Sequence, residues 1–135
     1  MIIINAENLI LGRMATFAAK QALLGQEVRI INAEKTIISG SKARILADTQ
    51  NARNRGTPRK GPFITKMPDR YVRRVIRGML PYKQAKGAEA YKRILCYTGV
   101  PEEFKDQTTT PLEYASFEKL PNLKYVTVGE VLKNI

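Results

Sequence analysis

The chain has 135 residues, 44% of them hydrophobic, which is typical of one globular domain with a core of its own. Its formal net charge is +11, and with no histidine and one cysteine it lacks histidine-based nucleophiles, histidine-ligated metals, thiolate zinc clusters and an internal disulfide. No apolar run reaches the roughly 18–20 residues of a membrane span, and the opening "MIIINAEN" has no basic region before its apolar stretch, so we expect a cytoplasmic protein with no membrane partner.

The first 31 residues have the pattern of a βαβ unit. Short apolar runs at 1–4 and 27–31 predict two strands, and 11–24 predicts a helix that Gly25 ends. Strand, helix and strand within about 30 residues imply a parallel sheet with a right-handed crossover. One side of the predicted helix carries its apolar residues, namely Leu11, Met14, Ala15, Ala18 and Ala22.

The tetrapeptide "INAE" occurs twice, at 4–7 and 31–34, each time at the end of a predicted strand. Glu7 and Glu34 would therefore lie at equivalent strand ends, and they are expected to be ion-pair or capping partners, since nothing else assembles an acid/base site around them. A second helix is expected over 41–53, and its inward-facing residues would be Ile45, Leu46 and Thr49.

The segment "SGSK" at 39–42 invites comparison with a phosphate-binding loop. It lacks the first glycine and the terminal hydroxyl of G-x-x-x-x-G-K-[ST], so the match is poor. Two interpretations stay open: Ser39 or Ser41 is an ordinary N-cap, or backbone N–H groups at this helix start hold one phosphate.

The next segment, 54–69, contains three prolines, two glycines and four basic residues, which excludes a regular element. Its middle is too apolar for a linker, because Phe63, Ile64 and Met67 lie there. We expect an extended basic segment that lies on another molecule.

The stretch "RYVRRVIRGMLP" at 70–81 predicts a helix with Asp69 as N-cap and Pro81 as its stop. Four arginines fall at i, i+3, i+4 and i+7 and so share one side, while apolar residues occupy the other. Solvated helix faces usually mix charges, because like charges at this spacing cost about 0.2–0.5 kcal/mol per pair. A polyanionic partner is the simplest explanation. Gly78 is explained either by close approach of another backbone or by fraying before Pro81.

The remainder predicts a short helix from about 87, a strand at 94–98 and an irregular acidic stretch at 102–118. Cys96 is expected to be a small buried hydrophobe within that strand. The acidic stretch is interpreted as a solvated loop, or as a contact for a basic neighbour. A brief extended segment precedes a C-terminal helix at about 128–135, for which Thr127 and Glu130 have capping-box spacing.

The positive charge is concentrated in the middle of the chain. Residues 41–93 carry fifteen Lys and Arg against three acids, a net charge of +12, whereas all other residues together carry −1. Such asymmetry points to nucleic acid first and to an anionic membrane second. Aromatic residues are interleaved with the cations, and Tyr82 is the best candidate for stacking on an unpaired base.

Five motifs occur in an order that resembles the universal family of large-subunit ribosomal protein thirteen: "LGRMA", "INAEK", "SGSK", "RGMLP" and "KRILCYTG". The resemblance covers about 1–101. The archaeal branch is the most similar, because "GTPRKGP" is followed by "PDRYVRRVIRGMLPYK". The chain lacks the histidine- and glycine-rich segment of bacterial members and the long helical C-terminal extension of eukaryotic ones.

This resemblance implies one three-layer α/β domain over 1–135, with a four-stranded parallel sheet flanked by helices and an added extended basic segment. It also implies a structural component of the large ribosomal subunit, which would bind rRNA and neighbouring ribosomal proteins as a monomer, without catalysis, cofactor or small-molecule substrate.

The basic segment and its matching motifs provide the expected RNA-binding residues: Ser41, Lys42, Arg53, Arg55, Arg59, Lys60, Lys66, Arg70, Arg73, Arg74, Arg77, Lys83, Lys86, Lys92 and Arg93. Three alternatives remain: a small nucleotide-binding phosphotransferase that uses residues 39–42, a non-ribosomal RNA-binding protein, and a peripheral membrane protein that lays 70–80 on anionic lipid.

Overall fold

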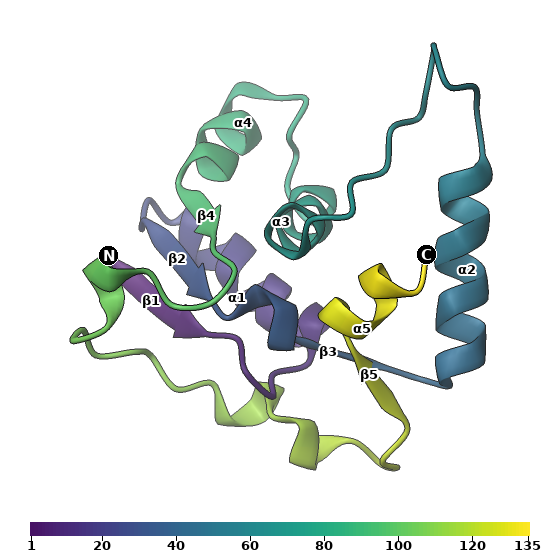
Figure 1. The fold of residues 1–135 in the computed structure, drawn as a ribbon. Coiled ribbons are helices and arrows are strands. Elements are labelled where there is room, and N and C mark those ends of the chain that lie inside the picture. The colour runs from purple at the N-terminus through teal and green to yellow at the C-terminus, as the bar shows by residue number, and fades with distance from the viewer.

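A computed structural model describes all 135 residues, and its central feature is a parallel sheet in the order β1-β2-β4. The strands are β1 (Ile2–Asn5), β2 (Val28–Ile31) and β4 (Ile94–Cys96) (Figure 1). Ile2 is opposite Val28, which in turn is opposite Ile94. The short apolar runs of the sequence therefore form strands, and the predicted βαβ unit is confirmed.

Helix α1 (Leu11–Leu23) connects β1 to β2 and packs by the face that its sequence predicts. All five predicted inward residues are buried, together with Ala19. Gly25 adopts a φ of +95° just after the helix, a conformation that glycine accepts and residues with a Cβ rarely adopt. The expected C-terminal stop is confirmed.

Three helices cover one face of the sheet. These are α1, α3 (Pro68–Gly78) and α4 (Ala85–Lys92), and one apolar core joins them to the strands. The other face has only a small cluster in which Ile3 and Ile31 meet Phe104. The expected α/β class is confirmed, with a helical layer on one face of the sheet; on the other face lies the short 3-10 turn that contains Phe104.

The parallel sheet has three strands, which corrects the expected four. At the outer edge of β1 lies an irregular segment, and the Thr110 N–H donates to the carbonyl of Ile3 at 2.8 Å. No ladder follows, because the chain turns into a 3-10 helix, η3 (Glu113–Ala115), a few residues later. The outer edge of β1 is thus bordered by a segment without regular pairing.

A second, antiparallel sheet joins β3 (Ile37–Ser39) to β5 (Tyr125–Thr127). The sequence predicted the extended segment before the C-terminal helix but not its pairing with β3. Helix α5 (Val128–Lys133) follows, and the Thr127 hydroxyl accepts a hydrogen bond from the Glu130 N–H at 3.2 Å. The predicted start of the C-terminal helix is confirmed.

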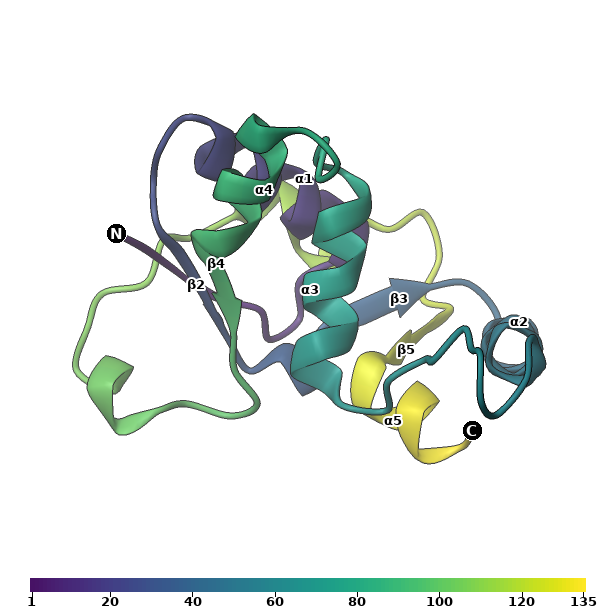
Figure 2. The ribbon, with the colours of Figure 1, turned by 90° about the horizontal axis from the view of Figure 1, so that it is seen from above.

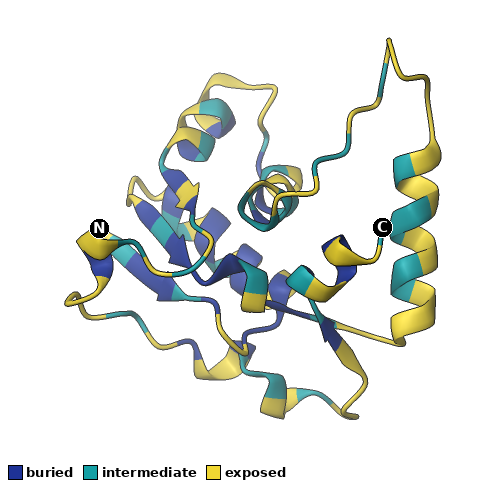
Figure 3. Ribbon diagram, viewed as in Figure 1, coloured by how far each residue is buried: buried dark blue, intermediate teal, exposed yellow.

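Helix α2 (Lys42–Asn54) stands apart from the rest of the molecule, and both views show it at the margin (Figures 1 and 2). None of its residues is buried, and Figure 3 shows it exposed on one side and half-buried on the other. Ile45, Leu46 and Thr49, expected to face inward, are half-buried only. The helix was predicted within one residue of its bounds, but its packing is much weaker than its apolar positions suggested.

The expected extended basic segment follows α2 as an arm over 55–67 that reaches outward and returns to α3 (Figure 1). Two hydrogen bonds close its tip, from Thr57 N–H to the Gly61 carbonyl at 3.1 Å and from Gly61 N–H to the Thr57 carbonyl at 2.9 Å. The lack of a regular element, predicted from its prolines and glycines, is confirmed.

The acidic stretch at 102–118 is irregular, as expected, and includes η2 (Glu102–Phe104), η3 and the start of η4 (Phe117–Lys119). It is not a fully solvated loop, because Phe104, Leu112 and Ala115 are buried. Its acidic side chains are exposed, so this stretch covers the body with apolar residues and presents its charge to solvent.

None of the helices combines the length and the apolar character that crossing a bilayer requires.

Candidate nucleic-acid interface

The arginine-rich helix α3 begins and ends slightly earlier than its sequence predicted. Met67 is its N-cap and Pro68 its first residue, so Asp69 lies inside the first turn and is not the cap. Proline suits this position because the first helical N–H has no partner within the helix. The helix ends at Gly78, three residues before Pro81.

The four arginines of α3 do not share one environment. Val72 and Ile76 are buried beneath the helix, which confirms its apolar side. Arg70 and Arg74 are exposed, whereas Arg73 and Arg77 are half-buried. The cationic stripe that the spacing predicted is therefore divided into an outward pair and a pair engaged with the protein.

Arg73 is bound to the protein's own backbone. Its Nε donates to the carbonyl of Ile94 at 2.8 Å, and its Nη2 donates to the carbonyl of Tyr91 at 3.1 Å. Its guanidinium carbon lies 3.9 Å from the centroid of the Tyr91 ring, which is a cation–π contact. These contacts give Arg73 the role of holding α3 against the end of α4 and the start of β4.

Arg93 and Arg77 are also engaged internally. The Nη1 of Arg93 donates to the carbonyl of Ala22 at 2.9 Å, near the end of α1, where carbonyls lack helical partners and a cation is favoured. Arg77 lies over the ring of Tyr82, 4.8 Å from its centroid. One face of Tyr82 is therefore covered, and the side chain remains 41% exposed.

The other expected RNA-binding residues are mostly free. No acidic group lies within ion-pairing distance of any of the fourteen predicted cations, because the three ion pairs of the molecule involve Arg29, Lys35 and Arg44. Ten of the fourteen cations, and Ser41 with them, are exposed: Lys42, Arg55, Arg59, Lys60, Lys66, Arg70, Arg74, Lys83, Lys86 and Lys92.

These cations lie on α2, the arm, α3 and the region around α4, which form the upper and right-hand part of Figure 1. The acidic stretch at 102–118, in green, lies below and to the left. The two charge types are thus separated in space as well as in sequence, and the basic surface is not neutralised from within.

A groove separates α2 from α3, with a volume of about 450 Å³. Its walls include Ala52 on α2, Ile64 in the arm, and Tyr71 and Val75 on α3. Arg74 also lines it. Burial raises the pKa of the Tyr71 hydroxyl, so this side chain stays neutral at ordinary pH. Sequence reasoning did not find this groove, because it depends on how segments distant in the chain are placed.

Arg53, the fourth half-buried cation, is on the last turns of α2. Its Nη1 is buried and has no hydrogen-bond partner in the protein. Buried donors are nearly always satisfied by protein or by ordered water, so this nitrogen is open to a water or to a bound group.

The turn at 39–42 is an ordinary helix start. The Ser41 hydroxyl accepts from the Arg44 N–H at 3.4 Å and so serves as the N-cap of α2. Gly40, with a φ of +126°, donates its N–H to the carbonyl of Lys124 at 2.9 Å. This N–H is therefore not available to a phosphate, and the N-cap interpretation is confirmed.

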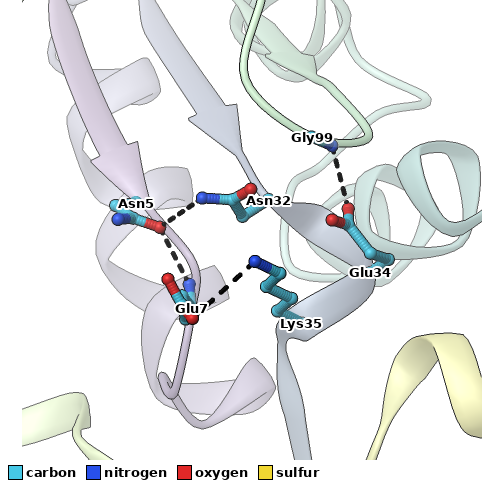
Figure 4. A network of polar contacts seen from close by, with 6 residues as sticks. All are labelled: Asn5, Glu7, Asn32, Glu34, Lys35 and Gly99. Atoms are coloured by element: carbon cyan, nitrogen blue, oxygen red, sulfur yellow. Dashed lines mark hydrogen bonds and ion pairs between the residues drawn. The ribbon is translucent and has the colours of Figure 1, made fainter. Parts of the chain in front are cut away.

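The repeated "INAE" residues form a polar network at the carboxyl ends of β1 and β2 (Figure 4). Asn5 Oδ1 accepts from Asn32 Nδ2 at 2.9 Å, and Glu7 Oε1 is 3.8 Å from Lys35 Nζ. Glu34 Oε2 accepts from the Gly99 N–H at 3.0 Å. The expected ion-pair role is confirmed for Glu7, whereas Glu34 forms no ion pair and binds a loop N–H. No group of acidic or cysteine side chains could hold a metal ion.

Residues 1–103 match the model of the ribosomal protein L13 family. The chain is 48% identical to "Large ribosomal subunit protein uL13" of Methanosarcina barkeri, with 97% of this chain and 94% of that protein covered. The protein of the same name from Methanococcoides burtonii is 43% identical, with 100% and 97% covered. The one from Archaeoglobus fulgidus is 38% identical, with 96% and 83% covered.

Proposed function

Since this chain belongs to the ribosomal protein L13 family, we propose that it binds and stabilises folded large-subunit rRNA, both during assembly and in the mature particle. As a member of this family it is a structural component of the large ribosomal subunit in the cytoplasm and is not an enzyme. Its relatives at 38–48% identity are archaeal, in agreement with the branch that the motifs indicated.

One observation carries the RNA-binding proposal: a surface with ten exposed, unpaired cations has no acid close enough to neutralise it. Like charges held together on one side of a folded protein repel each other unless a polyanion lies against them. The ribosomal setting supplies such a polyanion, because the rRNA backbone carries one negative charge per nucleotide.

The contacts would be made chiefly to phosphates. Arg70 and Arg74 present planar guanidinium groups to solvent, and such groups donate paired hydrogen bonds to neighbouring phosphate oxygens. The major groove of A-form RNA is too deep and narrow for side chains to read, so recognition would rely on folded shape and backbone. Binding would release counterions, which makes the affinity fall as salt rises.

The fifteen expected RNA-binding residues separate into two roles within this proposal. The ten exposed cations and Ser41 are the direct contacts, with Arg77 and Arg53 at their margin. Arg73 and Arg93 act by positioning, because their guanidinium groups hold α3 and α1 against the strands. Neighbouring ribosomal proteins are further partners, and the protein would be a monomer within the particle.

Of the three alternatives, the phosphotransferase loses its support because residues 39–42 form an N-cap with an engaged glycine N–H. The lipid-bound helix loses its support as well, because Val72 and Ile76 belong to the core and cannot face a bilayer. A non-ribosomal RNA-binding role would use the same surface, but the family favours the ribosome.

Sucrose-gradient fractionation of native lysate tests this function. We expect the chain to travel with the large ribosomal particle at both low and moderate salt. Purified chain should also bind transcribed large-subunit rRNA in a filter-binding assay, with an affinity that falls linearly with salt on logarithmic axes. A chain that sediments alone at both salt concentrations would refute the proposal.

A further inference from the structure

We propose that the groove between α2 and α3 receives an unpaired base of the rRNA, while cations on its two sides hold the adjoining phosphates. This inference rests on the proposed function, because it assumes that RNA is the partner. It adds a defined site and a binding mode, stacking in an apolar groove, to what would otherwise be binding by charge alone.

The groove has the size and the lining of a ligand site. Its volume of about 450 Å³ lies between two helices and the returning arm. Ala52, Ile64, Tyr71 and Val75 supply apolar surface, and Thr49 lies beside them with its hydroxyl donating to the carbonyl of Ile45 at 2.8 Å. Apolar walls with a few polar groups are what a flat, partly polar nucleobase requires.

The groove is open because α2 packs only weakly against the body. A helix of 13 residues with no buried side chain gains little from tertiary contacts, and one of this length is marginal when isolated. Ala52 on α2 and Tyr71 and Val75 on α3 line the groove without closing it. A planar group inserted between them would bury both surfaces at once and hold α2 in place.

Charge selects RNA over a neighbouring protein as the occupant. Arg74 lines the groove, and Arg70, Lys66 and Arg53 lie on the elements that form its sides. The only acid in the lining, Asp48, has its carboxylate 3.9 Å from the Nε of Arg44 on its own helix. An apolar side chain from a protein would fill the walls but leave these cations without partners.

Two alanines on α2 provide a matched test. Ala52 lines the groove, whereas Ala47 lies on the opposite side of the same helix, and both are exposed. Ala52→Phe would fill the groove without changing any charge, and Ala47→Phe adds the same ring where no groove exists. Circular dichroism and the thermal midpoint establish that each variant is folded.

The measurement is the affinity for transcribed large-subunit rRNA across a salt series. We expect Ala52→Phe to weaken binding about tenfold or more, in the range that loss of one stacked base produces, with the salt slope unchanged because no cation is lost. Ala47→Phe should bind like the wild type. Equal binding by both variants would overturn the groove proposal and leave the proposed function intact, whereas a wild-type chain that fails to bind rRNA would overturn the function itself.

Ultraviolet crosslinking of the wild-type complex provides a second readout that needs no variant. Zero-length crosslinks form where a base touches a side chain, so peptides that cover 49–52 or 64–75 should carry a nucleotide. If bound rRNA crosslinks only to other peptides, such as those containing Tyr82, the groove does not hold a base. If the groove instead binds a neighbouring ribosomal protein, protein-free rRNA would likewise crosslink only to other peptides.

Discussion

The Nε of Arg73 lies 2.8 Å from the carbonyl oxygen of Ile94, which joins the middle of α3 to the outer edge of β4. The carbonyl of Arg93, one residue earlier, accepts from Val28 on β2, so the carbonyl of Ile94 points away from the sheet. Unpaired groups at a sheet edge are available to any extended chain that approaches. Arg73 therefore satisfies an edge carbonyl that no strand reaches.

Replacement of Arg73 by alanine should destabilise the free protein. The variant loses two hydrogen bonds and the contact with the Tyr91 ring, for which we expect a decrease of about 1–3 kcal/mol in the free energy of unfolding. Urea unfolding measures it. The control is Arg74→Ala on the same helix, which should change stability by less than about 0.5 kcal/mol because Arg74 is exposed. Equal stability of the two variants would contradict the internal role of Arg73.

Replacement of both Arg70 and Arg74 by alanine should reduce the salt dependence of rRNA binding. Each lost phosphate contact lowers the slope of log affinity against log salt by about 0.7–0.9, so two contacts should lower it by about 1.5. The control removes Lys105 and Lys119, which are exposed but lie outside the basic segment. That control loses the same charge and should keep the wild-type slope; an equal change in both would show that only net charge matters.

Gly87→Ala should destabilise the protein because α4 begins tightly against the preceding loop. A Cβ at this position would overlap the carbonyl oxygen and carbon of Pro81, which are backbone atoms and cannot rotate away. Overpacking of this kind costs about 1–3 kcal/mol, measurable by thermal or urea unfolding. Gly12→Ala is the control, since a Cβ there meets nothing within 4 Å and alanine favours the helix. It should leave stability unchanged or slightly raised.

The Cys96 thiol should be unreactive in the folded protein. Burial raises its pKa from 9.0 to about 12, so almost no thiolate exists at neutral pH. A thiol reagent such as DTNB should modify it only after unfolding in urea. Rapid modification of the native protein at neutral pH would mean that β4 opens readily.

The same shift predicts a decline in stability at alkaline pH. Above pH 9.0 the unfolded thiol loses its proton, while the folded thiol keeps it until about 12. The unfolded state therefore binds fewer protons in this window, and the stability that the neutral buried thiol contributes is lost as pH rises through it. Urea unfolding at increasing pH should show a smaller decline for Cys96→Ala than for the wild type.

Thr127→Ala should remove the cap of α5. The threonine hydroxyl accepts from the Glu130 N–H at 3.2 Å, and losing such a cap costs about 1 kcal/mol. Thr127→Ser keeps the hydroxyl and is the matched control, with an expected loss well below that of alanine. Urea unfolding measures the loss of stability in Thr127→Ala and in Thr127→Ser.

Local features were predicted well because they depend on neighbours in the chain. The run of apolar residues in β1, the buried face of α1 and the stop at Gly25 all follow from periodicity and backbone preference over a few residues. The bounds of α2 and α3 were also close, although proline rather than Asp69 sets the start of α3.

Pairing and layering could not be predicted in the same way. β3 and β5 lie more than 80 residues apart in the chain, and nothing in either segment identifies the other as its partner. The outer edge of β1 could not be predicted either, because the irregular segment beside it comes from a distant part of the chain. Likewise, the position of the short η2 turn, rather than an α-helix, against the second face of the sheet depends on the path of the whole chain.

By itself, the sequence determined that cations gather between residues 41 and 93, since charge is a property of composition and order alone. Only the tertiary structure decided what each cation does. Arg73 and Arg74 are neighbours in one helix, but carbonyls of β4 and α4 lie beside the first and solvent beside the second. A guanidinium binds whichever acceptor lies within reach, and those acceptors come from distant parts of the chain.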